Sequence, residues 1–242
     1  RAGLPSQRPV PAILEFRDNP GPPATGPPMS DTAPLYRGAA RLAARLAILG
    51  ALLFLAVAGG LQLVRDDLAW QQATLSQYLR GPYGLLLRTM YCLLAVAIVA
   101  LAMGLYVQLA PRARSAAPVL LLCTGSLALA GVAIGDSWLP QVAPDFHLMF
   151  HHVCAITAFL CVVSGMVVQA WRFRPDAAWR RHFPLAATWS AACFVLLWVH
   201  ALWPPAGRGW VQKLLIALIV AAMLLAGAWL HQAARRADGG AG

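Results

Sequence analysis

Charged residues are scarce in this chain of 242 residues: they make up 12% of it, and lysine occurs only at Lys213. A soluble globular domain has about 25% charged residues. The composition therefore excludes a soluble enzyme and a disordered protein. Apolar side chains are abundant instead, at 60% of all residues with a mean hydropathy of +0.63. This balance predicts a polytopic membrane protein.

Several catalytic and metal-binding motifs are missing. The five cysteines lie in apolar runs and form no C-x-x-C pair, which argues against a disulfide framework or a thiolate metal site. Ser76 and Ser137 lie outside any G-x-S-x-G motif, so the signal for a serine nucleophile is weak. The chain has neither a glycine-rich phosphate loop nor an H-E-x-x-H motif.

Six apolar runs are each close to the roughly 20 residues that a helix needs to cross a bilayer. A segment in lipid must satisfy its own backbone polar groups, so each run is expected to be a helix. The predicted fold class is all-α, a bundle of six transmembrane helices. The predicted spans are Leu46–Val64, Tyr83–Ala110, Ser115–Gly135, Leu148–Ala170, Phe183–Trp203 and Trp210–Leu230.

Two of these runs carry a further signal. Ala56-Val57-Ala58 resembles a signal-peptide cleavage site, but the apolar run continues to Val64, which favours an uncleaved helix. Gly131 and Gly135 form a G-x-x-x-G pattern, which is expected to let a neighbouring helix approach closely.

The net charge of +10 is explained by the positions of the arginines and does not indicate nucleic-acid binding. From Arg37 onwards, eleven arginines precede the first span, follow the last, or lie in the second and fourth loops, whereas the opposite loops hold Arg65, Arg80 and Arg208. Cytoplasmic loops carry the excess of Arg and Lys in membrane proteins. The pattern predicts a multi-pass protein of the cytoplasmic membrane with both termini in the cytoplasm.

The two ends of the chain differ from its middle. Nine of the 18 prolines fall in the first 34 residues, and such a segment buries too little apolar surface to fold. We predict a disordered tail over residues 1–41, a transmembrane domain over 42–231 and a short basic, glycine-rich tail over 232–242. Met29 would make an ordinary translation start, so residues 1–28 are either outside the native chain or part of a cytoplasmic tail.

Ionisable side chains in the spans are concentrated near one membrane face, the predicted outer face. Such residues are costly inside a bilayer and are candidates for function. With a rise of about 1.5 Å per residue, all of them lie within about two helical turns of that face. The candidate residues for a polar, ligand-binding pocket are Ser76, Tyr78, Arg88, Asp136, His147, His151, His200 and Lys213.

His147 and His151 are spaced i,i+4, so both rings are expected on one helix face. That spacing suits a shared metal ion such as zinc, with His200 and Asp136 completing three or four ligands. A metal so held lowers the pKa of bound water towards 7 and produces a nucleophile for hydrolysis. The alternative is that these histidines only hydrogen-bond water, lipid headgroups and carboxylates.

Two other interpretations use the same residues. His151 and His200 offer axial ligands for a b-type haem, which is the weaker cofactor hypothesis because a single histidine pair supports it. Asp136 paired with Arg88 or Lys213 would form an ion pair that binds a lipid headgroup, carries protons, or only fixes the packing of the helices.

Four short stretches follow one another in a defined order relative to the spans. They are Leu75-Ser76-Gln77-Tyr78 with Gly81-Pro82-Tyr83-Gly84; Asp136 with His147 and His151; His200; and Gly209-Trp210-Val211-Gln212-Lys213. Together they resemble the domain of unknown function 998 family, uncharacterised six-helix membrane proteins of bacteria and archaea. The resemblance covers about residues 42–231 and implies architecture and membrane location, without an activity. A looser likeness is to seven-helix zinc-dependent intramembrane hydrolases, whose late H-x-x-x-H helix is missing here.

We therefore expect an integral membrane protein that binds a lipid or small ligand at its outer face. A zinc-dependent membrane hydrolase and a haem-dependent electron-transfer protein are the alternatives.

Overall fold

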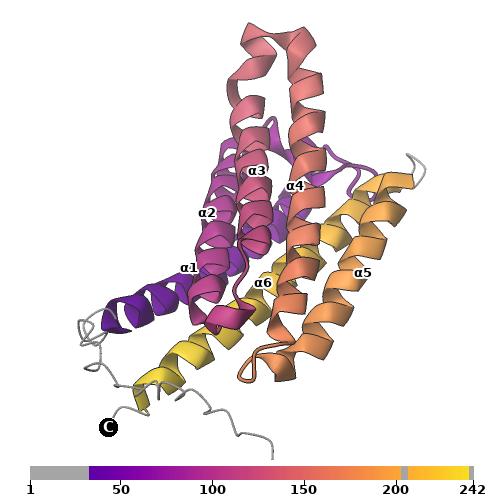
Figure 1. Ribbon diagram of the computed structural model, residues 1–242. Helices are drawn as coiled ribbons and strands as arrows, with labels where there is room; N and C mark the ends of the chain where they lie inside the picture. The colour runs from indigo at the N-terminus through magenta and orange to yellow at the C-terminus, as the bar shows by residue number, and fades with distance from the viewer. Residues whose placement is uncertain (1–32, 203–206, 240–242) are drawn as a thin grey trace, which may run out of the picture.

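The computed structural model describes residues 33–202 and 207–239, and the regular structure in these ranges is entirely helical (Figure 1). Six helices in this part of the chain are long and apolar enough to span a membrane, which confirms the predicted all-α architecture. They are α1 (Ala33–Val64), α2 (Gly84–Gln108), α3 (Ala116–Val142), α4 (Pro144–Phe173), α5 (Phe183–Leu202) and α6 (Arg208–Gly239). Short 3-10 helices lie between them: η1 (Leu75–Leu79), η2 (Pro111–Ala113) and η3 (Arg180–His182).

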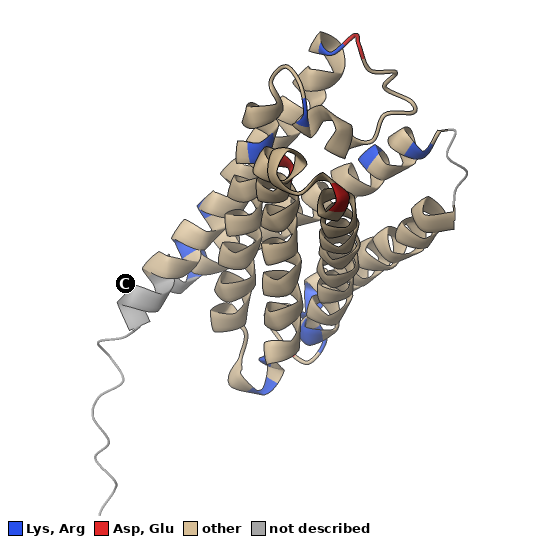
Figure 2. Ribbon diagram, turned by 90° about the horizontal axis from the view of Figure 1, so that it is seen from above, with Lys and Arg blue, Asp and Glu red and all other residues tan. Residues whose placement is uncertain are grey.

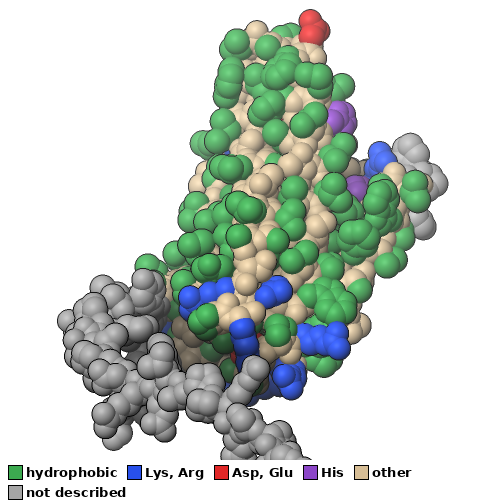
Figure 3. Space-filling view, viewed as in Figure 1, with side chains coloured by type: hydrophobic (Ala, Val, Ile, Leu, Met, Phe, Trp, Pro, Cys, Tyr) green, Lys and Arg blue, Asp and Glu red, His purple; other side chains and the backbone are tan. Residues whose placement is uncertain are grey.

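Helices that are consecutive in the chain pack side by side, and α1 closes the ring against α6. The most extensive contact joins α3 and α4, whereas α5 is the most peripheral helix. Hydrophobic side chains cover most of the face that α3, α4 and α5 present in Figure 3, and basic side chains gather along its lower border. An apolar outer surface of this kind suits a lipid environment.

Glycines allow α3 and α4 to approach closely. A Cβ atom added at Gly125 would lie 2.7 Å from Val162 Cγ2, and one at Gly135 would lie 2.6 Å from the Phe150 ring. At Gly131 the Cys154 sulfur would be 3.0 Å away. The close approach predicted from the G-x-x-x-G pattern is confirmed, and it brings the end of α3 against the start of α4.

The connection between α3 and α4 is shorter than predicted. The sequence suggested that Asp136 closes the third span, but α3 continues through Pro140 to Val142, and Ala143 alone separates it from Pro144. Proline is tolerated in the last turn of a helix in lipid when other groups satisfy the freed backbone, and Pro144 suits the first position of α4. Asp136 therefore lies inside a helix rather than at its end.

The helices also extend beyond the predicted domain boundaries. The chain is helical from Ala33, so the end of the predicted tail over residues 1–41 belongs to α1. Its alanine and leucine residues are good helix formers. Likewise α6 continues past residue 231 to Gly239. The predictions for residues 1–32, for residues 240–242 and for Trp203 lie outside the described residues.

The two ends of the bundle are named here by their loops. The η1 end carries residues 65–83 and the α3–α4 connection, and the η2–η3 end carries the two basic loops. Figure 2, viewed from above, shows basic residues mainly near helix ends and in loops, with very few acidic ones. At the η2–η3 end, Arg172 Nε donates to the carbonyl of Ala113 at 2.7 Å and ties the two loops together. That this end faces the cytoplasm stays a prediction.

Candidate functional site

Asp136, His147 and His151 lie together where α3 meets α4. The Asp136 side chain is 1% exposed, and its Oδ1 is 2.5 Å from His147 Nε2 and 3.3 Å from His151 Nδ1. Both histidines therefore point from one face of α4 towards the same carboxylate.

Arg80, from the loop after η1, reaches the same carboxylate. Its Nη2 atom is 3.6 Å from Asp136 Oδ1 and 3.3 Å from His147 Nε2, and the side chain is half exposed. The cationic partner of Asp136 is thus Arg80, rather than Arg88 or Lys213 as the sequence suggested. The sequence signal was the position of Arg80 in the same outer loop as Ser76 and Tyr78.

Arg88 serves the backbone of Asp136 instead of its carboxylate. The residue four positions after Asp136 is Pro140, which has no N–H to donate to the Asp136 carbonyl. Arg88 Nη1 donates to that carbonyl at 3.3 Å. An arginine on α2 therefore replaces the hydrogen bond that the proline removes, and it fixes α3 against α2 beside the cluster.

Arg65 holds the loop that delivers Arg80. The Arg65 side chain is buried, and its Nη1 atom donates to the carbonyls of Arg80 at 2.8 Å and Pro82 at 3.0 Å. The same guanidinium donates to both carboxylate oxygens of Asp67, at 2.6 and 2.7 Å. This hydrogen-bonded pair lowers the pKa of Asp67.

Lys213 and Tyr78 form a separate structural contact. Lys213 Nζ donates to Gln62 Oε1 and to the Trp70 carbonyl, both at 2.6 Å, and lies 4.9 Å from the centre of the Tyr78 ring. Burial raises the pKa of Tyr78. No hydrogen bond or ion pair within the described residues joins either side chain to Asp136. Lys213 thus tethers the first loop to α6.

The start of α6 also supports η1. Gln212 Oε1 accepts a hydrogen bond from the backbone N–H of Leu75 at 2.9 Å. A Cβ atom at Gly209 would lie 2.5 Å from the Ala73 carbonyl, so only glycine allows this approach. The residue types at Gly209, Gln212 and Lys213 are therefore explained mainly by their contacts with the first loop.

Ser76, His151 and His200 line one cavity of about 430 Å³ between η1, α4, α5 and α6, called the outer cavity below. Gln212, His152 and Arg208 also line it, and of these three only Gln212 lay in a stretch that carried the resemblance. His200 Nδ1 is buried and has no hydrogen-bond partner among the described residues. His200 is not in the Asp136 group of potential metal ligands, although the sequence suggested that it would be.

The sequence profile of the family described as "Protein of unknown function (DUF998)" matches residues 48–229. The chain belongs to the DUF998 family. No curated protein and no solved structure is similar enough to count as a match. In this DUF998 protein, the segments that carried the resemblance lie at or near the η1 end. There they contribute to the first loop, to the cluster of Asp136, His147 and His151, and to the outer cavity.

Proposed function

We propose that Asp136, His147 and His151 bind a divalent transition metal, zinc above all, and that the protein is a metal-dependent hydrolase of membrane lipids. One observation carries the proposal: a potential ligand atom from each residue lies within 4.8 Å of the other two. Catalytic zinc sites commonly have three protein ligands of these types and keep one position open.

The unused oxygen of Asp136 supports a cation. Asp136 Oδ2 is buried and lacks a hydrogen-bond partner in the described ranges. A buried acceptor without a partner costs about 1–3 kcal/mol, and more when it is charged. A metal ion would remove this cost by coordinating the carboxylate.

The outer cavity supports a lipid substrate. Its wall between α4 and α5 includes Ile156 and Trp198, which are 64% and 52% exposed. In a membrane these apolar side chains face acyl chains, which supports entry of a lipid from the side of the bilayer. His151 belongs to both the metal group and the cavity wall, which supports a bound lipid whose polar end lies beside Asp136 and His147.

A bound divalent ion would supply an activated water, whose pKa it lowers towards 7. Hydrolysis would add the oxygen of that water to the acyl carbon of the lipid and break the bond from that carbon to the leaving alcohol or amine, and a proton of the water would pass to the leaving group. His200 lines the same cavity, and its imidazole would accept the proton of the water and pass it to the leaving group. Ser76 offers a hydroxyl to orient the substrate.

Elemental analysis of the purified protein tests the metal site. About one zinc per chain is expected, and His151→Ala and Asp136→Asn should lose most of it. His152→Ala is the matched control, because His152 is the next residue but bonds the carbonyl of Leu148 instead of Asp136. Metal well below one per chain that His151→Ala leaves unchanged would overturn the proposal.

Hydrolysis is tested on vesicles that contain ester- or amide-linked acyl lipids. A chelator should abolish acyl release and added zinc should restore it, and Asp136→Asn should stay inactive in both conditions. Zinc-loaded protein that releases no acyl chain from either class would refute the hydrolase and leave a metal-binding protein.

The contacts of Arg80 favour a second candidate, a protein that binds an anionic lipid without metal. Arg80 partly balances the charge of Asp136 and leaves half of its own side chain open to a headgroup. In that case Arg80→Gln would weaken binding to anionic vesicles but not neutral ones. The haem hypothesis stays a prediction, and a Soret band of the protein purified from haem-replete cells would support it.

A further inference from the structure

The outer cavity adjoins a second cavity inside the bundle, and the two share part of their lining. This middle cavity, of about 90 Å³, shares Ser76, His151, Ala155, Phe159 and Gln212 with the outer one. The shared residues include three of the polar groups in its lining, so the polar end of the middle cavity is the one that faces the site. From there its lining is mostly apolar and includes Leu94, Ile98, Val132 and Val220, which are all buried.

Water does not explain the deeper part of this space. One water needs about 10–15 Å³ of cavity volume, so there is room for several waters. Each of them would need two to four polar partners. The deep walls offer leucine, isoleucine and valine side chains. An empty apolar space also loses dispersion contacts on every side. A flexible hydrocarbon chain needs no polar partners and restores the dispersion contacts with the walls.

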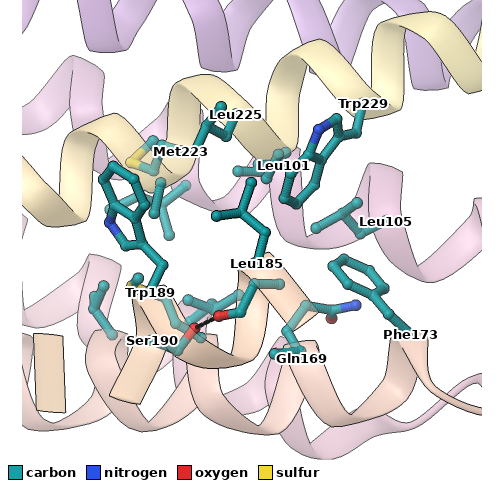
Figure 4. Close-up of a pocket in the computed structure, with 18 residues that line it drawn as sticks. Leu101, Leu105, Gln169, Phe173, Leu185, Trp189, Ser190, Met223, Leu225 and Trp229 are labelled. Atoms are coloured by element: carbon teal, nitrogen blue, oxygen red, sulfur yellow. Dashed lines mark hydrogen bonds between the residues drawn. The ribbon is translucent and has the colours of Figure 1, made fainter. Parts of the chain in front are cut away.

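A third, distal cavity of about 70 Å³ lies beyond Ile98 and Val162, the two residues that line both the middle and distal cavities. Figure 4 shows the distal cavity, with Leu101, Trp189 and Trp229 among the side chains around it. Gln169 Nε2 is buried beside it without a partner in the described part of the chain.

We infer that the middle cavity binds one acyl chain of the lipid whose polar end lies at His151, and that Ile98 and Val162 set the preferred chain length. The distance along α2 from Tyr91, another residue of the middle cavity, to Ile98 is about 10 Å at 1.5 Å per residue. The preferred substrate is thus a lipid with one medium-length acyl chain. The inference depends on the proposed function only for the position of the polar end.

Competition binding measures this preference directly. The wild-type protein in nanodiscs is loaded with a fluorescent fatty acid, which is displaced by monoacylglycerols with octanoyl to hexadecanoyl chains. Each buried methylene contributes about fourfold in affinity, so affinity should rise with chain length and then stop rising once the chain reaches Ile98 and Val162.

Variants of the residues that line the middle cavity distinguish a limit on chain length from nonspecific hydrophobic binding. Val162→Ala and Ile98→Ala open the middle cavity towards the distal one. In these variants the affinity should keep rising up to longer chains, and hexadecanoyl chains should bind about tenfold more tightly than to the wild type. Leu129→Phe fills the middle cavity and should favour octanoyl chains. Leu101→Ala is the control, because Leu101 lines only the distal cavity and does not separate the two.

The inference is overturned if no monoacylglycerol competes, or if Val162→Ala, Ile98→Ala and Leu129→Phe all keep the wild-type dependence on length. A cooperative thermal transition for each variant shows that it is folded. Asp136→Asn separates the two proposals: if it loses the metal but keeps the length preference, the metal site and the acyl-chain cavity are independent. A length preference in wild-type protein that binds no metal would refute the hydrolase and leave the acyl-chain cavity standing.

Discussion

At the scale of single residues, Asp136 depends on a different arginine for each of its polar groups. Arg80 faces its carboxylate, whereas Arg88 bonds the carbonyl that Pro140 cannot serve. Both arginines come from the segment around the start of α2. Arg80 Nη2 lies 3.6 Å from Asp136 Oδ1, and Arg88 Nη1 lies 3.3 Å from the Asp136 carbonyl oxygen. One arginine therefore lies at the carboxylate of Asp136 and the other holds the backbone that carries it.

Arg88 and Pro140 should be energetically coupled. Arg88→Leu leaves the Asp136 carbonyl without a donor and should destabilise the protein by about 1–3 kcal/mol. Pro140→Ala restores a backbone N–H at the right position, so the double variant should recover much of that loss. Thermal unfolding of the four proteins in detergent measures the coupling. Strictly additive effects would show that Arg88 acts elsewhere.

The Arg65–Asp67 pair should make the first loop sensitive to acid. Because Arg65 lowers the pKa of Asp67 below 3.8, the ionised pair stabilises the fold above that value and the contribution is lost as the pH falls through the lowered pKa. The effect is small because Asp67 is half exposed. The wild-type melting temperature should exceed that of Asp67→Asn at pH 6, and the difference should shrink towards pH 3. A difference that does not change with pH would contradict this assignment.

At the scale of the helices, the α3–α4 pair positions the site. Asp136 and the two histidines come from opposite sides of a nearly direct helix–helix connection, so any separation of these helices would move the ligand atoms apart. The close approach depends on glycines, because the facing atoms belong partly to backbone that cannot move aside.

Gly125→Leu should therefore be severely destabilising. Its side chain would meet Val162 Cγ2 and the backbone of Val162 and Ala158, and overpacking of this kind costs typically 1–3 kcal/mol or more. Gly59→Leu is the matched control, because a Cβ atom at Gly59 has no described atom within 4 Å. Size-exclusion profiles and melting temperatures would show the contrast; equal behaviour of the two variants would refute the packing argument.

At the scale of the whole molecule, function depends on which side of the membrane the η1 end faces. The arginine distribution predicts that it faces outward and that the η2–η3 end faces the cytoplasm. The outer cavity would then take its ligand from the outer leaflet, and zinc would be supplied from outside the cell.

Cysteine labelling tests this orientation. Asp66→Cys in the first loop should react with a membrane-impermeant maleimide added to intact cells, whereas Arg112→Cys should react only after the membrane is permeabilised. The wild-type protein, with its five native cysteines, gives the background in both conditions. Labelling in the reverse pattern would place both termini outside and refute the positive-inside argument.

The sequence by itself determined the membrane class, the six helices and the family, because hydrophobic length and motif order do not depend on how helices rotate about their axes. It also placed His147 and His151 on one helix face, because their separation is close to one turn. The tertiary structure alone decided which polar residues meet. Hydropathy is insensitive to the direction of a side chain, so it could not show that Arg80 faces Asp136, that Arg88 serves a carbonyl freed by Pro140, or that Lys213 fixes a loop. Those partnerships depend on packing between segments that are distant in the chain.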